Sequence, residues 1–531
     1  MKNAAADAAA RFAALADAHR ARRALSPNGF GLDARTWSDL DLDQVFSKID
    51  RTASTLGQAA LYHRLRSAYG AAELAAFESL VDRFTADGRA RERARTAVGR
   101  LRDPQGYNLW WMGDPGAIEQ RPWFAVFPLL TVAAIAGLVL IPYSAIPVVA
   151  ILIINLFVRA ATHRDIGRIT QAFRQLAPVI AAAQSLRFLA GDDQASIVRP
   201  LVEDAGRLSR LKMLSRWSNE NPLMLSLSAN PVAMMVNDFI SVVYEYVNTL
   251  LLLDATGVYF GARDLRIHCG ALLRVVAAIG DIDAAAAVAE WRDGQPVWSR
   301  PVFTDDGQVV AVDLCHPLLD QPTPNSIRLH LGQGVLVTGS NMSGKSTFLR
   351  TVGVTAVMAQ TINTCCAREY RAPRFRVRSC IGRADDLAAG KSYYVVEAET
   401  VVELIHSSEN GEPHLILLDE LFHGTNAVER IAAADAVLHS LVADQDGPKP
   451  HLVIAATHDH ELISLLAGSY AAYHFGDSIG KDGPVFDHRL VAGPSTTRTA
   501  LALLRQKGAP EGLVERAAAT ARRLDENRAQ V

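Results

Sequence analysis

The chain has 531 residues, which is long enough for roughly two to four domains, each burying its own core. Its formal net charge is -2, so the overall charge gives no case for binding nucleic acid, and any such binding must come from local patches. The five cysteines show no CxxC spacing, which argues against a zinc site and a disulfide framework and favours reduced thiols facing the cytosol.

The first 300 residues, apart from one apolar insertion, show the pattern of helices. Residues 1–37 are rich in alanine and arginine and have no long apolar stretch, so we expect a solvated helical arm rather than a cleaved signal peptide. Farther on, apolar residues recur three and four positions apart, which predicts amphipathic helices. We therefore expect a mainly α-helical core or lever domain in two parts, residues 38–120 and residues 162–300.

The apolar insertion, residues 121–161, contains 36 uncharged residues from Trp123 to Val158. A membrane-spanning helix needs only about 20 apolar residues. The turn around Pro142 divides the run into two arms, of which the second is short and ends near Val158. Basic residues flank both outer ends, so a transmembrane hairpin with both ends in the cytoplasm fits the positive-inside rule. A buried hairpin and a re-entrant loop are the alternatives.

A second apolar region, Asn221–Leu253, is interrupted by Asp238 and Glu245. Ionised side chains are costly at bilayer depth. We therefore favour helices in a protein core over membrane insertion for this region.

Near residue 301 the pattern changes to short β-rich runs that alternate with helical segments, which predicts a mostly parallel sheet covered on both faces. Within this region Gly339–Ser346, GSNMSGKS, fits the phosphate-binding P-loop between a strand and a helix. Such a loop binds phosphate oxygens through backbone N–H groups and the helix N-terminus. Lys345 is assigned to the β and γ phosphates of ATP, and Ser346 to Mg²⁺. The predicted ATP-binding residues are Gly339, Ser340, Asn341, Met342, Ser343, Gly344, Lys345, Ser346 and Thr347.

Two later apolar runs end in residues suited to ATP hydrolysis. The first, His414–Leu418, is followed by Asp419 and Glu420. We assign Asp419 to the Mg²⁺ shell and Glu420 to activation of the attacking water. The second run ends before His458, which we expect to hydrogen-bond the γ-phosphate, although a lone histidine at a strand end is more often structural.

The order of these motifs is typical of ATPases of the ABC type, which work as dimers. In place of the LSGGQ signature of the transporters stands GRADDLAAGKSYYVVEAE, Gly382–Glu399. This segment closely resembles DDLASGRSTFMVE of the MutS family of mismatch-repair ATPases. The resemblance implies a homodimer in which a signature loop with Gly390, Lys391 and Ser392 reaches the partner's γ-phosphate.

Three other motifs carry the same resemblance. The P-loop resembles GPNMGGKST and differs at Ser340 and Ser343, and AATHDHEL is similar to FATHYHEL. The stretch LLDELFHGTNAVER resembles MDEIGRGTSTYDG but departs from it at Phe422 and His423. The resemblance implies an ATPase that uses ATP and Mg²⁺.

The resemblance covers residues 301–531, including a C-terminal helical element, and reaches Phe46–Arg66 and Ile279–Trp291 more weakly. The fold class expected is an α/β P-loop ATPase domain of ABC type with a mostly parallel sheet, preceded by the helical core or lever domain with its apolar hairpin. The chain departs from the repair proteins because we find no N-terminal mismatch-reading domain. The interval of the DNA clamp also looks shortened and holds the hairpin. These departures count against mismatch recognition.

The leading hypothesis is a MutS-like homodimeric switch with ATP-driven lever motion, tethered to the membrane through residues 123–158, with the ATPase domain in the cytoplasm. DNA binding related to mismatch repair is kept as a candidate function. The basic stretches Gly88–Arg102 and Ala367–Arg378 are its candidate contacts, and the first is also a candidate contact for anionic lipid. The alternative is an ATP-driven membrane remodelling or transport-coupling protein that does not bind DNA. A third hypothesis, a nucleotide-dependent scaffold, is disfavoured because Glu420 and His458 are both present.

Overall fold

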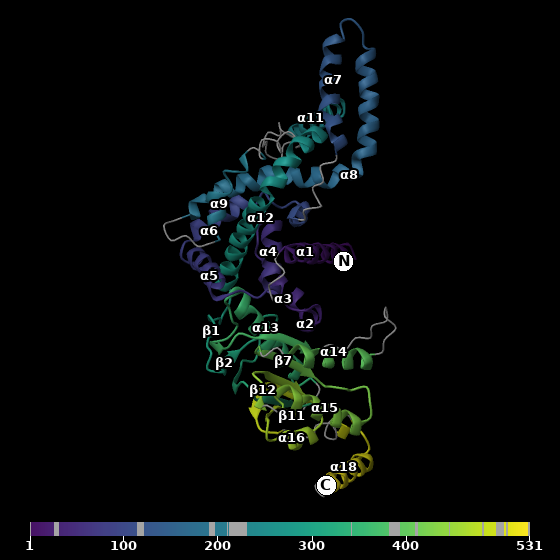
Figure 1. Cartoon of the computed structure of the whole chain (residues 1–531). Coiled ribbons are helices and arrows are strands. Elements are labelled where there is room, and N and C mark those ends of the chain that lie inside the picture. Colours follow the sequence, from purple (N-terminus) through teal and green to yellow (C-terminus); the bar gives the residue numbers. More distant parts are fainter. Residues whose placement is uncertain are drawn as a thin grey trace. The chain divides into compact units, whose positions relative to one another are not determined.

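The computed structural model of the chain forms two compact units (Figure 1). Unit 1 comprises residues 1–29, 49–64 and 70–294, and unit 2 comprises residues 30–48, 65–69 and 295–531. The chain therefore passes from one unit to the other after residues 29, 48, 64, 69 and 294. The structure describes residues 2–25, 31–113, 122–190, 197–209, 211, 231–340, 342–381, 393–408, 412–444, 447–480, 483–494, 504–505 and 508–528.

The described secondary structure of unit 1 is helical, as the apolar periodicity predicts. Its longest helix, α12, packs against α5, α6, α7, α8 and η1. The helices of this unit are α1 (Lys2–Ala24), α4 (Thr55–Arg66, ending in the segment of unit 2), α5 (Ala71–Ala86), α6 (Gly88–Val98), η1 (Pro104–Gly113), η2 (Pro122–Ala125), α7 (Val126–Leu140), α8 (Ile146–Ser185), η3 (Leu186–Leu189), α9 (Arg199–Glu203), α11 (Pro231–Leu251) and α12 (Leu253–Asp293).

Asp283 on α12 ties the start of α4 to the core of unit 1. Its buried carboxylate accepts hydrogen bonds from the backbone N–H groups of Ala53 (3.0 Å) and Ser54 (2.9 Å) and from the Ser54 hydroxyl (2.6 Å). Burial raises the pKa of Asp283 to about 6, against the opposing effect of these donors. Gly57 makes the approach possible, because a Cβ there would lie 2.1 Å from the carboxylate. The beginning of α4 is thus fixed by a contact between residues far apart in sequence.

Helix α1 packs in unit 1, which corrects the expectation of a solvated arm over residues 1–37. Leu15 and His19 are buried, and His19 Nδ1 lies 3.0 Å from His63 Nδ1. The Arg22 guanidinium lies over the ring of Trp110 at 4.7 Å. The alanine-rich composition left these anchoring side chains inconspicuous in the sequence.

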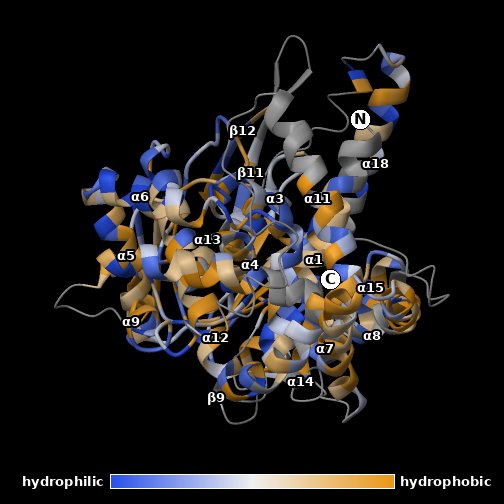
Figure 2. Cartoon of the chain, turned by 90° about the horizontal axis from the view of Figure 1, so that it is seen from above, coloured by the Kyte–Doolittle hydropathy of each residue, from blue (hydrophilic) through white to orange (hydrophobic). Residues whose placement is uncertain are grey.

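The apolar insertion forms an antiparallel pair of helices, α7 and α8, that extends from the rest of unit 1 (Figure 1). The segment Trp123–Leu140 is long and apolar enough to cross a membrane, and most of it is exposed; core helices of soluble proteins pass the same length test. The apolar part of the second arm is short, as predicted, and covers Ile146–Ala161, but helix α8 itself continues to Ser185. Charged residues after Val158 end the apolar run but do not end a helix. Figure 2 shows the hydrophobic colouring of both helices.

Unit 2 contains strands and helices in alternation. Its elements are α2 (Ala34–Asp39), α3 (Leu42–Ile49), β1 (Val302–Phe303), β2 (Gln308–Leu314), β3 (Asn325–His330), β4 (Gly334–Thr338), α13 (Lys345–Ile362), β5 (Glu369–Ala372), β6 (Arg376–Cys380), α14 (Tyr393–Ser408), β7 (His414–Asp419), α15 (Ala427–Val442), β8 (Ala443–Asp444), β9 (Gly447–Pro448), β10 (Leu452–Ala456), α16 (Glu461–Leu465), β11 (Tyr470–Gly480), β12 (Gly483–Ala492) and α18 (Glu511–Arg528).

The larger sheet of unit 2 has the strand order β12-β11-β4-β10-β7-β6. Neighbouring strands from β11 to β6 pair in parallel, and β12 pairs antiparallel at one edge. Strands β4 and β10 are buried along their whole length, as expected for parallel strands covered on both faces. Helices α14 and α15 cover part of the sheet through the cluster that includes Val401, Leu438 and Leu441. A smaller sheet has the order β1-β5-β2-β3.

Side chains of helix α2 accept hydrogen bonds from residues of the edge strand β6 and the residue after it. Residues 30–48 therefore belong to unit 2, whereas the sequence predicted that the helical core begins at residue 38. The backbone N–H of Ser379 donates to Thr36 Oγ1 at 3.1 Å. Asp39 Oδ2 accepts from the Ser379 hydroxyl at 2.8 Å and from the Ile381 N–H at 2.9 Å. Covering an edge in this way removes unpaired backbone groups that would otherwise pair with another chain.

Replacing Asp39 by alanine should destabilise unit 2, because the buried donors of Ser379 and Ile381 then have no acceptor. The expected loss is about 1–3 kcal/mol. Asp39→Asn is the matched control, since it keeps an oxygen acceptor at the same place and should retain most of the stability. The denaturant midpoint of the purified full chain measures both. Equal midpoints for the wild-type and alanine chains would show that this carboxylate does not stabilise the sheet edge.

Candidate functional site

Three neighbouring strands bring the predicted site residues together. Strands β4, β10 and β7 run parallel, and Ala456 is in register with both Val337 and Asp419. Their carboxyl ends therefore meet at one edge of the sheet, where ligands bind in open α/β sheets. The P-loop follows β4, Glu420 follows β7, and His458 follows β10.

The P-loop joins β4 to α13 through two glycines with left-handed backbone conformations. The φ angles are +144° at Gly339 and +118° at Gly344. A Cβ at Gly339 would lie only 2.8 Å from Ser343 Oγ. Lys345 is buried, and its Nζ donates to the carbonyl oxygens of Gly339 (2.9 Å) and Ser340 (3.1 Å). The loop thus surrounds the ammonium group that is predicted to bind phosphate.

The two residues predicted to bind Mg²⁺ are in contact. The Ser346 hydroxyl donates to Asp419 Oδ2 at 2.5 Å. Asp419 Oδ1 is buried and has no hydrogen-bond partner among the described residues, and the same holds for the hydroxyls of Ser340 and Ser343. A hydroxyl and a carboxylate are hard oxygen donors of the kind Mg²⁺ prefers. These residues fit a magnesium ion that takes its other ligands from phosphate and water.

Glu420 lies between two imidazoles. Its Oε1 is 2.8 Å from His458 Nε2, and its Oε2 is 3.5 Å from His423 Nδ1. His458 Nε2 is also 3.3 Å from Lys345 Nζ. The Glu420 side chain is only 12% exposed. The ammonium that would bind phosphate and the candidate base therefore both lie close to one imidazole nitrogen, His458 Nε2.

Glu397 holds the loop after Glu420, a role that the sequence did not reveal. Glu397 is fully buried on α14, and its Oε1 accepts from the Phe422 N–H at 2.9 Å. Phe422 has a φ of +56°, in the left-handed region where the resembling stretch has glycine. Glu397 matches the glutamate at the end of DDLASGRSTFMVE, the stretch that Gly382–Glu399 resembles, and that match named no partner for it.

Arg430 on α15 fixes the loop that carries His458. Its guanidinium donates to both carboxylate oxygens of Asp459, at 2.8 and 2.6 Å, and this pairing raises the pKa of Arg430. The Asp459 N–H in turn donates to Thr457 Oγ1 at 3.0 Å. No motif in the sequence identifies this pair, because its members lie 29 positions apart.

A cavity of about 410 Å³ lies over the P-loop and reaches Glu420. This volume is within the range of small-molecule sites. His316 lines it, and burial together with the Arg350 cation lowers the pKa of this histidine to about 4, so it is neutral at pH 7. Other lining residues are Leu319, Gln321, Thr323, Asn325, Phe475 and His488. The cavity therefore offers both a phosphate end and a wall for the remainder of a nucleotide.

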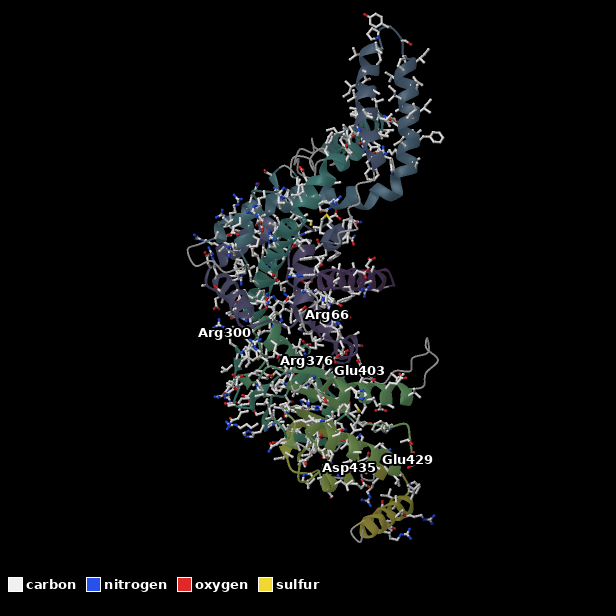
Figure 3. The ribbon with its side chains drawn as sticks, viewed as in Figure 1. Arg66, Arg300, Arg376, Glu403, Glu429 and Asp435 are labelled. Carbon is white, nitrogen blue, oxygen red and sulfur yellow. The ribbon has the colours of Figure 1, made fainter. Side chains whose placement is uncertain are left out.

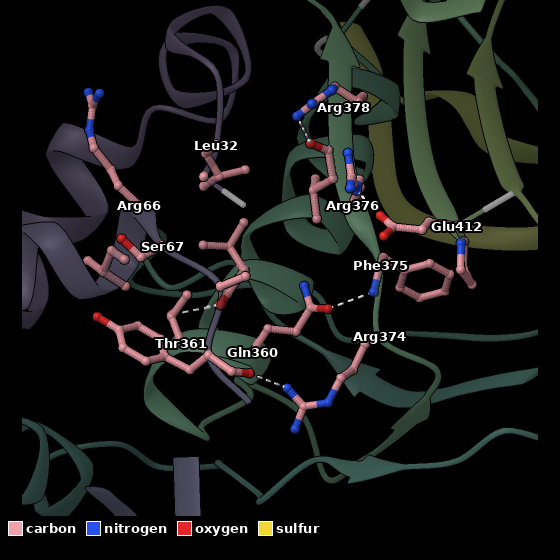
Figure 4. A pocket seen from close by; sticks show the side chains of 17 residues that line it. Leu32, Arg66, Ser67, Gln360, Thr361, Arg374, Phe375, Arg376, Arg378 and Glu412 are labelled. Atoms are coloured by element: carbon pink, nitrogen blue, oxygen red, sulfur yellow. Dashed lines mark hydrogen bonds and ion pairs between the residues drawn. The ribbon is translucent and has the colours of Figure 1, made fainter. Parts of the chain in front are cut away.

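The basic stretch Ala367–Arg378 makes its contacts within unit 2. Three of its arginines line a second cavity, of about 330 Å³ (Figure 4). The contacts are Arg368 with Asp313, Arg371 with Asp306, Arg374 with the carbonyl of Tyr69, Arg376 with Glu412, and Arg378 with Asp33. Because four of these five partners are carboxylates, this stretch is a poor candidate for binding DNA phosphates.

The signature loop with Gly390, Lys391 and Ser392 lies outside the described residues, as does Asn341 of the P-loop. The described chain resumes at α14, which begins at Tyr393. The structure therefore places Met342, Thr347 and the other described members of the predicted ATP site, but not these four residues.

Residues 335–525 match the family MutS domain V. The DNA mismatch repair protein MutS of Thermus thermophilus is 33% identical over 260 residues, which are 48% of this chain and 30% of that protein. The DNA mismatch repair protein MutS 2 of Halobacterium salinarum is 33% identical over 256 residues, 46% of this chain and 28% of that protein. The MutS of Methanosarcina acetivorans is 31% identical over 267 residues, 48% of this chain and 29% of that protein.

The chain thus spans less than a third of the length of these relatives. All the site residues from Gly339 to His458 fall within the matched domain. The matched residues lie in unit 2, and over this part the chain is similar to MutS domain V and to the MutS proteins named above.

Proposed function

We propose that this protein binds and hydrolyses ATP with Mg²⁺ at the P-loop site of unit 2. The observation that carries the proposal is the chain of contacts from Lys345 through His458 to Glu420, at 3.3 and 2.8 Å. A phosphate-binding ammonium and a carboxylate base are the two ends of the machinery that phosphoanhydride hydrolysis needs. The match to MutS domain V supports the same reaction.

In the proposed mechanism, Lys345 exchanges its carbonyl partners for the β and γ phosphate oxygens of ATP. Ser346 and Asp419 would hold Mg²⁺, and the ion would supply positive charge against the phosphate oxygens. Glu420 accepts a proton from the water that attacks the γ phosphorus, and the bond from that phosphorus to the β-γ bridging oxygen breaks. His458, in contact with Glu420, orients the carboxylate and hydrogen-bonds the γ-phosphate.

The proposal extends to a homodimeric switch of the ABC-related type. In it, Gly390, Lys391 and Ser392 of one subunit complete the site of its partner, and hydrolysis moves the helical levers. Glu397 supports a link between the signature loop and the base. It lies on α14, binds the Phe422 N–H in the loop after Glu420, and α14 begins at Tyr393, directly after Ser392 in the sequence. The state of the signature loop can then influence the base through α14.

We propose that the protein lies at the membrane, with residues 123–158, which form α7 and the first part of α8, in the lipid and the ATPase domain in the cytoplasm. The support is the exposed apolar surface of both helices, with Val139 70% and Phe157 76% exposed. A large exposed apolar surface marks an interaction with another protein or with a membrane. Anionic lipid is the proposed partner of the arginines on α6 that precede the hairpin in the sequence.

DNA remains the candidate ligand of the levers because the relatives are named DNA mismatch repair proteins. Two arginines of the α6 stretch, Arg91 and Arg95, pair with Asp293 and Glu290 on α12. This pairing reduces the positive charge that these two arginines offer to phosphates, whether of DNA or of anionic lipid. The second candidate function, ATP-driven membrane remodelling without DNA, is favoured by the exposed hairpin.

Glu420→Gln should preserve ATP binding and slow turnover by about 10²-fold or more, because the amide cannot accept the proton of the attacking water. Steady-state phosphate release and equilibrium nucleotide binding measure the two effects separately. The control is Glu403→Gln, which changes an exposed glutamate on α14 outside the site (Figure 3). Normal turnover of the Glu420 variant would remove this residue from the role of base.

Lys345→Ala should weaken ATP binding by roughly 10- to 150-fold, which corresponds to the loss of about 1.5–3 kcal/mol of charge-assisted hydrogen bonding. Titration with a fluorescent ATP analogue measures the affinity, and the unfolding midpoint of the variant shows whether the effect is local. An unchanged affinity would overturn the assignment of the phosphate site.

The choice between the two functions rests on the ATPase rate of the purified full chain with linear duplex DNA or with anionic liposomes, each at two salt concentrations. Stimulation by DNA that weakens as salt rises is the result expected for contact with phosphate backbones. An ATPase rate that does not change with DNA but rises with anionic liposomes would exclude the DNA-binding switch in favour of the membrane-coupled ATPase.

A further inference from the structure

The chain turns sharply between α11 and α12, beside the apolar hairpin. Helix α11 ends at Leu251, α12 begins at Leu253, and Leu252 between them has a φ of +49° in the left-handed region. Leu252 is buried in a cluster with Phe124, Phe127 and Ala255. The Leu252 side chain is therefore packed against Phe127 in the first turn of α7 and against Phe124 just before that helix.

Polar side chains from both hairpin helices satisfy the backbone at this turn. The Asn155 amide of α8 donates to the carbonyl of Leu250 at 2.5 Å. The Thr131 hydroxyl of α7 donates to the carbonyl of Leu251 at 2.6 Å and lies 2.9 Å from the hydroxyl of Thr256. Asn155 is fully buried. The last carbonyls of a helix have no partner within that helix, and in a soluble protein water commonly binds them.

The turn lies about half-way along the hairpin. Thr131 precedes the end of α7 by nine residues, and Asn155 follows the start of α8 by nine residues. At 1.5 Å per residue, both caps are roughly 14 Å from the hairpin tip, or about half the thickness of the hydrocarbon core. If the hairpin spans a bilayer, the carbonyls of Leu250 and Leu251 lie near the middle of that bilayer, where no water is present to donate hydrogen bonds to them.

The outer face of α11 continues the apolar surface of the hairpin. Val242, Val243, Tyr246 and Val247 are exposed, Tyr246 by 73%. In Figure 3 the side chains on α7 and α8 are mostly carbon, unlike those of the helices below them. The expectation of core helices over Asn221–Leu253 did not include this exposed face of α11, and residues 221–230 lie outside the described part of the chain.

Two charged residues within this surface are paired with each other. Glu245 on α11 contacts Arg159 on α8 at 2.5 Å. Arg159 also donates to the hydroxyl of Thr249. Pairing reduces the cost of bringing these charges close to lipid. Between Tyr246 and Ala262, Asp254 is the one charged residue in the sequence.

We propose that the α11–α12 turn is a re-entrant membrane element. Residues 242–260 enter the lipid beside α7 and α8, turn back at Leu252, and contact acyl chains through the exposed valines and Tyr246. At the C-terminal end of α11, Thr131 and Asn155 donate the hydrogen bonds to the backbone carbonyls that water would otherwise donate. This inference rests on the proposed insertion of the hairpin and adds a second membrane-contacting segment to it.

The test uses the full chain, with its five native cysteines replaced, in liposomes of phosphatidylcholine and phosphatidylglycerol. Single cysteines at Val247, at Val132 on α7 and at Val202 on α9 carry a bimane fluorophore, and lipids brominated in the middle of the acyl chain quench it. We expect quenching at 247 and 132 and none at 202, where the exposed side chain belongs to the helical body.

The outcomes separate this inference from the proposed tether. Quenching at 132 without quenching at 247 overturns the re-entrant element and leaves the hairpin in the membrane. Absence of quenching at both positions removes the tether as well. If the fluorescence at position 247 changes with protein concentration but not with brominated lipid, the exposed face of α11 binds a second copy of the chain. That result also overturns the re-entrant membrane element.

Variants of the caps test the role of Asn155 and Thr131. Asn155→Leu and Thr131→Val remove the donors to Leu250 and Leu251 and should lower quenching at 247 at least twofold, while quenching at 132 is unchanged. Ser144→Ala, in the hairpin turn, is the matched loss of a polar group and should change neither. An unchanged signal at 247 in the folded double variant, with folding checked by its ATPase rate, overturns the capping role.

Discussion

The parallel register of β4, β10 and β7 is the constraint on which the rest of the site depends. The pairing of Ala456 with both Val337 and Asp419 sets the P-loop, the acidic pair and His458 at one level. A slip of one residue would turn the Asp419 side chain to the opposite face of the sheet. Buried, uninterrupted apolar strands protect this register, because any slip would also bury polar residues from their ends.

The loop after β7 stores conformational strain at the point where the candidate base is held. Glu420 and Phe422 both have positive φ angles, at +52° and +56°, and neither is glycine. Such conformations persist only when surrounding contacts impose them. The buried carboxylate of Glu397 provides one such contact, because it binds the N–H of Phe422. The orientation of the base is therefore coupled to α14. A glycine in place of Phe422 would adopt the positive φ angle without such a contact.

Local sequence patterns predicted the site residues that stand at the ends of strands. The P-loop, Asp419, Glu420 and His458 each follow an apolar strand, and the structure brings them together. The patterns could not show that residues 34–39 belong with the ATPase strands. A helix of this composition fits either unit, and the deciding hydrogen bonds run from Asp39 to residues 340 positions away. For the same reason Arg430 and its carboxylate partner had no signal in the sequence.

The boundary between the two units falls within a single helix. Residues 49–64 belong to unit 1 and residues 65–69 to unit 2, and α4 contains the change from one to the other. Asp283 holds the first segment through Ser54, and the guanidinium of Arg374 holds the second through the carbonyl of Tyr69 at 2.6 Å. Each segment is therefore fixed by a hydrogen bond within its own unit, which no local pattern in the sequence of α4 could have predicted.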